Sequence, residues 1–319
     1  MSTLKESGYK PYLMEAEEKL HTPKRVDYQL RKRLASDYLG ILQAAPGEAH
    51  AILTQLYRHF EIENLKAVLR GINSNASWER VRFVLFPLGS FSKLPYQQMM
   101  ETGSIEQAVE LLSKTPYYAA LSYALERYST EQSLFPLEVS QDISYWRALW
   151  KHVGMLSGQD REQARRIIGP LVDVTNLIWA IRYKVYHNLA EEEIINYTLS
   201  FGYHVRDADI RAIAAGMDIA EVVMRLYPDL ENVENLLQDP QHGLPKLELQ
   251  LQRYIVQKCK NAFAGYPFHV GIPLAYLLLK EFEIQDLTVL LEAKAAGLPA
   301  EEFVPYMVTI SMTGENAVA

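Results

Sequence analysis

The sequence is poor in cysteine and has no excess of basic charge. Its 319 residues include a single cysteine, Cys259, which excludes a disulfide within the chain and indicates a reducing compartment. Acidic residues outnumber basic ones by 39 to 32. A nucleic-acid-binding protein normally carries a basic stripe, so we expect no nucleic-acid partner.

Long hydrophobic runs are also missing. The longest uncharged stretch, 265–279, is interrupted by two prolines and a histidine, and a helix that spans a bilayer needs roughly 20 mostly apolar residues. The first ten residues are polar, so we expect no secretory signal there. Contact with a membrane is therefore expected only through partners.

Motifs of catalysis and cofactor binding are absent as well. The chain has no phosphate-binding loop, no dinucleotide-binding glycine motif, no serine-hydrolase motif and no paired-histidine zinc motif. Asp207 and Asp209 could form a metal pair, but Arg206 and Arg211 flank them, and a solvated helix start is the preferred interpretation. Cys259 has no paired histidine and is expected to be inert. We expect no catalytic residue, cofactor or metal.

The chain does contain one six-residue pattern three times. It consists of an apolar residue, an acid, a β-branched residue, any residue, Asn or Asp, and Leu, and it occurs at 60–65, 172–177 and 282–287. Its fifth position holds Asn64, Asn176 and Asp286, with intervals of 112 and 110 residues. Internal repeats bear on the fold before any local signal does. The even spacing predicts three similar units with approximate threefold symmetry.

Each copy predicts a helix, a tight turn and a second helix. Apolar residues occupy positions one, four and five after the Asn/Asp, which is the spacing of a buried helix face. They are Leu65, Val68 and Leu69, then Leu177, Ala180 and Ile181, then Leu287, Leu290 and Leu291. We expect each motif to begin its helix and each of the three leading leucines to be almost fully buried.

The second helix of each copy is marked by an acid. Glu79, Glu191 and Glu301 lie fifteen residues after the Asn/Asp, where an acid opposes the positive end of a helix dipole. Three residues are expected to help begin these helices: Ser77 as an N-cap, Asn188 as a capping partner of Glu191, and Pro299 at the first helical position.

The third copy is shorter than the others. Only 33 residues follow Asp286, so the N-terminal stretch is expected to cover its core, with the two chain ends meeting. The expected domains are a first helical repeat with an N-terminal extension (1–120), a second repeat (121–235) and a shortened third repeat (236–319).

The repeated polar position allows two interpretations. In the structural one, each Asn or Asp bonds to a neighbouring helix end within its own domain. In the functional one, the three residues surround the threefold axis together with Arg70 and Arg182, six residues later, and contact a partner there. The third copy has Glu292 at that position, so it cannot complete a ring of three arginines.

Several stretches together resemble a known family. They are Asn64-Leu65 with 67–70, Asp173 with Asn176-Leu177 and Arg182, and 271–281 continuing through Leu287 to 297–299. In order and spacing these stretches are similar to the C subunit of the prokaryotic V-type (A/V-type) ATPases and ATP synthases, whose eukaryotic counterpart is the d subunit. The resemblance extends over the whole length and includes the shortened last unit.

The resemblance implies an all-α fold, with three similar helical domains in a pseudo-threefold funnel. It implies a non-catalytic central-rotor subunit, peripheral on the cytoplasmic face of the membrane, that transmits torque for ion transport coupled to ATP synthesis or hydrolysis. The implied partners are the central-shaft subunits and the membrane rotor ring, with the membrane stator subunit and the peripheral stalks as further candidates. The candidate shaft-interface residues are Arg70, Arg182, Asn64, Asn176 and Asp286.

Two other classes of protein remain open. A general helical adaptor could stack helix-turn-helix units into an open solenoid, although solenoid periods run from about 20 to 50 residues and this period is about 110. An all-helical enzyme could assemble its site from dispersed residues such as Glu191, His204 and Asp207. An elongated molecule would favour the adaptor, and a deep pocket with convergent carboxylates and a histidine would favour the enzyme.

Overall fold

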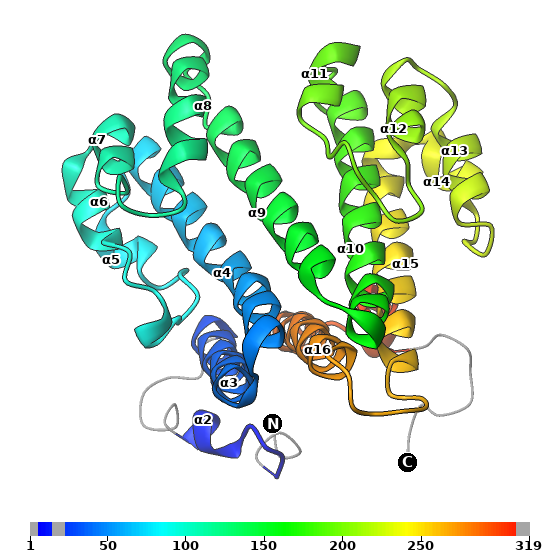
Figure 1. Cartoon of the computed structure of the whole chain (residues 1–319), viewed down its shortest axis with the longest axis horizontal. Coiled ribbons are helices and arrows are strands. Elements are labelled where there is room, and N and C mark those ends of the chain that lie inside the picture. Colours follow the sequence, from blue (N-terminus) through cyan, green and yellow to red (C-terminus); the bar gives the residue numbers. More distant parts are fainter. Residues whose placement is uncertain (1–5, 15–22, 311–319) are drawn as a thin grey trace. The chain divides into compact units, whose positions relative to one another are not determined.

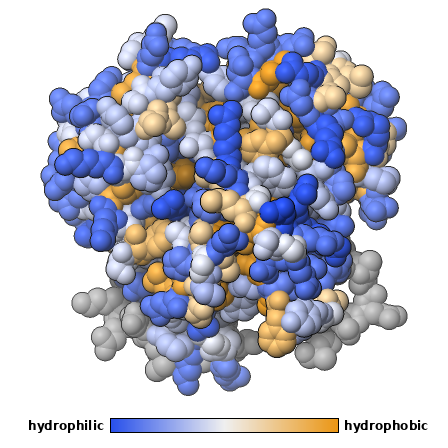
Figure 2. Space-filling view, viewed as in Figure 1, coloured by the Kyte–Doolittle hydropathy of each residue, from blue (hydrophilic) through white to orange (hydrophobic). Residues whose placement is uncertain are grey.

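The protein is built from helices. The computed structural model describes residues 6–14 and 23–310, and no strand occurs among them (Figure 1). With 73% of the chain helical, the all-α prediction is confirmed. No helix in the described ranges is both long enough and apolar enough to cross a bilayer. On the face seen in Figure 2, hydrophilic side chains predominate, with apolar groups scattered among them.

Two compact units make up the chain. The first unit is 31–152, and the second unit combines the residues up to Leu30 with those from Val153 onward. Helices α3 (Pro23–Ala44) and α9 (Phe135–Met155) cross the boundaries. The first unit also contains α4 (Gly47–Asn73), α5 (Trp78–Val81), the 3₁₀ turn η1 (Gly89–Phe91), α6 (Tyr96–Thr102), α7 (Ile105–Glu110) and α8 (Tyr118–Glu131).

Among the described residues, the first helix of the second unit is the short α2 (Lys10–Met14). Its remaining elements are α10 (Gly158–Val185), α11 (Glu191–Asn196), α12 (Asp207–Ala214), α13 (Ile219–Leu226), α14 (Val233–Gln238), α15 (Pro240–Asn261), α16 (Gly271–Ala295), α17 (Ala300–Phe303) and η2 (Val304–Tyr306). The three repeats 1–120, 121–235 and 236–319 stay a prediction.

Each repeated motif lies inside a long helix. The three helices are α4, α10 and α16, and their Asn/Asp residues are far from either end. The expectation that each motif begins its helix is wrong, because the apolar spacing continues upstream of the motif. In α4, for example, Ile52, Leu53 and Leu56 are buried before the motif begins.

The three motif helices end in the same way. Each ends with a turn that contains one residue in the left-handed region, where asparagine and glycine are favoured. These residues are Asn75 (φ 50°), Asn188 (φ 48°) and Gly297 (φ 72°). In the first turn the Ala76 N–H donates to the Gly71 carbonyl at 2.8 Å, and in the third the Leu298 N–H donates to the Ala293 carbonyl at 2.9 Å. The predicted helix, turn and second helix are present in all three copies.

The second helices begin as expected only in part. Glu79, Glu191 and Glu301 all lie in the first turn of α5, α11 and α17, as predicted. Ser77 takes the N-cap position, where its backbone carbonyl accepts the Arg80 N–H at 3.0 Å.

The capping roles expected of Asn188 and Pro299 are wrong. The N-cap of α11 is Ala190, whose N–H donates to the Glu193 carboxylate at 3.3 Å. Asn188 provides the left-handed turn instead. Pro299 is the N-cap of α17 rather than its first residue.

The leading leucines are not buried alike. Leu65 and Leu177 have no exposed surface. Leu287 is only half-buried, which contradicts the expectation for the third copy. The segment that follows the third motif helix is short, consisting of α17 and η2 up to residue 310, whereas three or four helices follow the other two. Within the described residues, less of the chain thus follows this helix to cover its face.

The N-terminal stretch contacts the third motif helix. Within the second unit, the Thr288 hydroxyl donates to the Asp27 carboxylate at 2.7 Å. The Lys280 ammonium lies 5.5 Å from the centre of the Tyr9 ring. The extreme chain ends, up to residue 5 and from residue 311, lie outside the described residues, so their expected meeting stays a prediction.

Truncating the leucines should show the difference in burial. We expect Leu65→Ala and Leu177→Ala each to lower the free energy of unfolding by about 2–5 kcal/mol, as at other buried leucines. Leu287→Ala should lower it by less, since this side chain is partly hydrated in the parent. Chemical denaturation followed by circular dichroism measures all three. A loss at Leu287 equal to those at Leu65 and Leu177 would contradict the difference in core packing.

Candidate functional site

The repeated asparagines hold the backbone that follows each second helix. The Asn64 amide donates to the Phe86 carbonyl at 2.9 Å, and its oxygen accepts the Phe86 N–H at 2.7 Å. Asn176 makes the same two bonds to Leu199, at 2.8 and 2.7 Å. Asn64 and Asn176 are only 3% and 1% exposed. One side chain thus satisfies both backbone groups of a buried residue, which would be costly to leave unpaired.

The third copy achieves the same contact with a carboxylate. Asp286 accepts the Val308 N–H at 2.6 Å and the Thr309 N–H at 2.8 Å, and it also accepts the Thr309 hydroxyl. A carboxylate cannot donate, so it pairs with two N–H groups where an amide pairs with one N–H and one carbonyl. This difference explains why Asp can replace Asn only where two donors face it.

These contacts correspond to the structural interpretation, in which each Asn or Asp bonds within its own domain. The bonding partner is a backbone segment after the second helix and not the end of a helix. Asn64, Asn176 and Asp286 are buried within their own units, so a partner could touch them only if the local fold opened. Their place at a shaft interface stays a prediction, and any effect on a partner would act through the segments that they hold.

The acid of the second motif is also buried. Asp173 has no exposed surface and accepts the Tyr203 and His204 N–H groups, both at 2.6 Å. Burial raises the pKa of this carboxyl above its ordinary value, against the lowering effect of those hydrogen bonds. A Cβ at Gly202 would lie 2.0 Å from the Val205 carbonyl oxygen, so only glycine fits in this loop.

The two candidate arginines each pair with a glutamate on the neighbouring long helix. In the first unit, Arg70 on α4 makes two bonds to Glu138 on α9, at 2.6 and 2.7 Å. In the second unit, Arg182 on α10 bonds to Glu248 on α15 at 2.5 Å. The two arginine side chains remain 58% and 43% exposed. Glu138 and Glu248 are 110 residues apart, within two residues of the 112 that separate Arg70 from Arg182, and that spacing could have identified both.

The surroundings of the Arg70–Glu138 pair are charged. Lys66, one turn before Arg70, bonds to Asp142 at 2.9 Å and to Glu63 at 2.6 Å. Burial lowers the pKa of the Lys66 ammonium, but Asp142 and Glu63 together outweigh it and raise this pKa above its ordinary value. The cation is thus held in its charged form by two carboxylates.

The surroundings of the Arg182–Glu248 pair are mostly apolar and carry no further charge among the residues that line the same cavity. Ile178 and Gln252 occupy the positions that correspond to Lys66 and Asp142. Together with Arg182 and Glu248, they help to line a cavity of about 190 Å³ within the second unit, which Phe282 also borders. Each arginine therefore forms an ion pair with a glutamate, but the surroundings of the two pairs differ. Glu292, at the corresponding position of the third copy, is exposed.

The two aspartates that could have formed a metal pair are both paired with arginines. Asp207 pairs with Arg211 and Asp209 with Arg225, both at 2.5 Å. The expected competition from Arg211 is confirmed, whereas Arg206 bonds to Asp209 through its backbone N–H. Within the part of the chain that the structure describes, no three His, Cys, Asp or Glu residues are grouped to hold a metal.

The Cys259 thiol should be unreactive in the folded protein. It has no exposed surface, and burial raises its pKa to about 12. Since the thiolate is the nucleophile, we expect negligible reaction with a disulfide reagent at pH 8 and full reaction in denaturant. The absorbance of the coloured thiolate that the reagent releases measures the reaction under both conditions. Rapid reaction without denaturant would contradict the burial of this helix face.

The chain matches a family of ATP synthase subunits. Residues 1–304 match the family model described as ATP synthase (C/AC39) subunit. The C subunit of the A-type ATP synthase of Methanocaldococcus jannaschii is 24% identical, over 96% of this chain and 77% of its own length. The proteins of the same name from Haloferax volcanii and Methanococcoides burtonii are each 25% identical, over 86% and 93% of this chain and 78% and 82% of their own. The resemblance seen in the sequence is thereby confirmed, and the chain belongs to the ATP synthase (C/AC39) subunit family.

Proposed function

We propose that this chain is the non-catalytic central-rotor subunit of a rotary A/V-type ATP synthase or ATPase. It links the central shaft to the membrane rotor ring and transmits torque between ATP chemistry and ion transport. The observation that carries the proposal is the family match over 1–304, together with relatives that are named as the C subunit of A-type ATP synthases. The complex would hold the chain at the cytoplasmic face of the membrane as a peripheral subunit.

The proposed shaft contact centres on the exposed ion pairs. Arg70 and Arg182 occupy equivalent positions and remain accessible beside Glu138 and Glu248. Exposed ion pairs contribute little to stability, so they can exchange partners at small cost when another charged surface arrives. A shaft without threefold symmetry needs a contact surface that also departs from symmetry. Glu292 in the third copy, and the different surroundings of the two arginines, provide such a departure.

Affinity capture tests the proposal. The chain, tagged and expressed in its own host, is captured from detergent-solubilised membranes. Shaft and ring subunits should be recovered with it, and the membrane stator subunit and the peripheral stalks should follow if the complex stays intact. A parallel capture from cells with the untagged chain measures background. Recovery of the chain without shaft or ring subunits would contradict the proposal.

The proposed architecture is a funnel of three similar helical domains, 1–120, 121–235 and 236–319, around one axis. Small-angle X-ray scattering separates this from a helical adaptor. A funnel gives a compact envelope, whereas an open solenoid gives an elongated one. An elongated envelope would contradict the funnel.

A further inference from the structure

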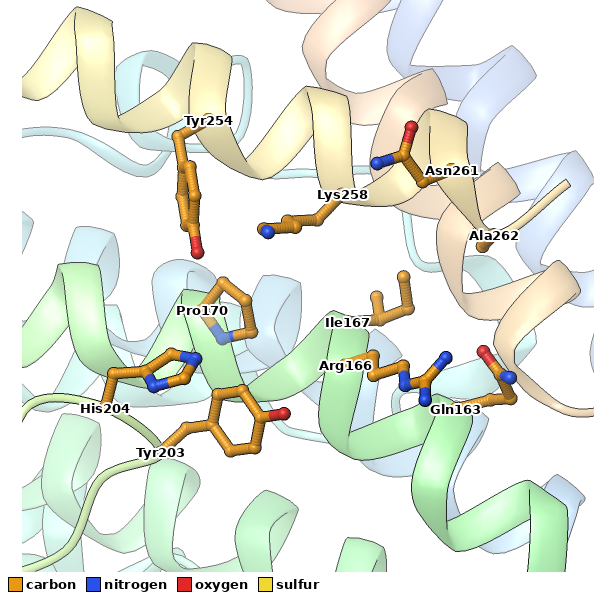
Figure 3. A pocket seen from close by; sticks show the side chains of 10 residues that line it. All are labelled: Gln163, Arg166, Ile167, Pro170, Tyr203, His204, Tyr254, Lys258, Asn261 and Ala262. Atoms are coloured by element: carbon orange, nitrogen blue, oxygen red, sulfur yellow. The ribbon is translucent and has the colours of Figure 1, made fainter. Parts of the chain in front are cut away.

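A second cavity of the second unit lies between α10 and α15. It has a volume of about 320 Å³. Figure 3 shows Arg166 and Pro170 of α10 on one side, facing Tyr254, Lys258 and Asn261 of α15 on the other. Tyr203 and His204, from the loop that Asp173 holds, close one end. The cavity is therefore formed by three segments that the fold fixes relative to one another.

The lining of this cavity is basic in an acidic protein. The chain has a formal net charge of −7, yet none of the ten described residues that line the cavity is acidic. Lys258 lies 4.7 Å from the centre of the Tyr254 ring. Arg166 pairs with Glu162 one turn earlier, and both of these side chains are largely exposed. Such a pair holds its arginine weakly, and the guanidinium is free to exchange partners.

The repeat indicates that these cations are not needed for packing. The interval between motifs aligns Arg166 with Thr54 on α4, and the interval between the paired glutamates aligns Lys258 with Ala148 on α9. The first unit therefore forms the equivalent helix pair without either charge. Neither charge is therefore needed to hold the two helices together, so both cations are available to an anionic ligand.

We propose that this cavity binds a phosphate group of a ligand, with Arg166 and Lys258 as its cationic contacts. Both cations bind phosphate well, arginine through paired N–H donors and lysine as a point charge. The Gln163 and Asn261 amides and the two tyrosine hydroxyls add neutral donors around the same cavity. The site is distinct from the Arg70 and Arg182 pairs and does not depend on the rotor role.

Two sources could supply the phosphate: a soluble phosphorylated molecule or the headgroup of an anionic lipid. The loop after Ala262, which borders the cavity, exposes Phe263, Tyr266 and Phe268 by 48%, 59% and 77%. Exposed aromatic side chains beside a phosphate site would suit the boundary between headgroups and acyl chains. The test therefore includes an arm for each source.

The experiment measures binding to the full chain. Pyrophosphate binding is followed by calorimetry, and binding to phosphatidylglycerol vesicles by co-sedimentation, with phosphatidylcholine vesicles for comparison. The test variant is Arg166→Gln with Lys258→Gln. The matched control is Arg147→Gln with Lys151→Gln, which removes the same charge from two exposed residues of α9. A third variant, Phe263→Ser with Phe268→Ser, changes only the aromatic loop. Circular dichroism verifies the fold of each variant.

The parent should bind pyrophosphate or phosphatidylglycerol vesicles. The variant of Arg166 and Lys258 should bind at least tenfold more weakly. The α9 control should bind with the same affinity as the parent. Vesicle binding that the aromatic-loop variant loses identifies a lipid headgroup as the source. Pyrophosphate binding without vesicle binding identifies a soluble ligand. An equal loss in the α9 control, or no binding by the parent in either arm, overturns the proposal.

Discussion

Exchanging amide for carboxylate at the repeated polar position should destabilise the protein in both directions. Asn176→Asp removes the donor to the Leu199 carbonyl and places a carboxylate against that buried oxygen. Asp286→Asn places an NH₂ group against a backbone N–H of Val308 or Thr309. A buried group left without a partner costs about 1–3 kcal/mol, and more when charge is involved. We expect the free energy of unfolding to fall by about 2–4 kcal/mol in Asn176→Asp and by about 1–3 kcal/mol in Asp286→Asn.

Urea denaturation followed by circular dichroism measures these losses. Gln285→Glu is the matched control, because it makes the same amide-to-acid change at the exposed neighbour of Asp286. The free energy of unfolding of this control should stay within about 0.5 kcal/mol of the parent's. If Asn176→Asp were as stable as the parent, the hydrogen bonds to Leu199 would not be what holds this segment.

Reversing the charge of the two exposed arginines should uncouple the motor without unfolding the chain. In the variant Arg70→Glu with Arg182→Glu, we expect ion pumping to fall several-fold while ATP hydrolysis continues. The physical reason is that, at the proposed shaft contact, two cations would become anions beside Glu138 and Glu248. The loss should be greater at low salt, where exposed charges are least screened. Pumping and hydrolysis are measured side by side in reconstituted vesicles.

A charge swap separates the contact role from the ion pairs themselves. Adding Glu138→Arg and Glu248→Arg restores both pairs with their polarity reversed, so the fold should recover whatever stability the pairs contribute. A contact with the shaft predicts that pumping stays low in this variant. Full pumping by the folded swap would remove Arg70 and Arg182 from the interface. The swap does not restore the long arginine side chains at positions 70 and 182, so circular dichroism checks that both variants keep the fold.

The sequence indicated the three motif helices, the turns that end them and the acids in the first turn of each second helix. The positive-φ turns at Asn75, Asn188 and Gly297 have chemical signatures that a reader of sequence can recognise. The acids that follow these turns mark helix starts, because a carboxylate opposes the positive end of the helix dipole. The start of the motif helices was missed. A repeated apolar pattern shows which side of a helix is buried, but it does not show at which residue the helix begins. Leu287 was missed because its burial depends on which segments pack against this helix face, and the apolar spacing does not show that.

The partners of the polar residues were beyond the sequence. The Asn64 side chain bonds to Phe86, and Arg70 bonds to Glu138, 68 residues away. Such pairings depend on how α4 packs against the segment after α5 and against α9, and local spacing does not encode this. The 110-residue interval between Glu138 and Glu248 could have indicated the second pairing.

The measurement that tests the central proposal most directly is rotation of this chain within the complex. The single native cysteine of this chain is buried, so Tyr123→Cys, at a site 84% exposed, provides one accessible thiol on the chain for attaching a bead. The ATPase head of the complex is fixed to a surface and ATP is added. The proposal predicts that the bead rotates continuously in one direction and stops when ATP is withdrawn. A bead that stays still on complexes that are hydrolysing ATP would contradict the rotor assignment.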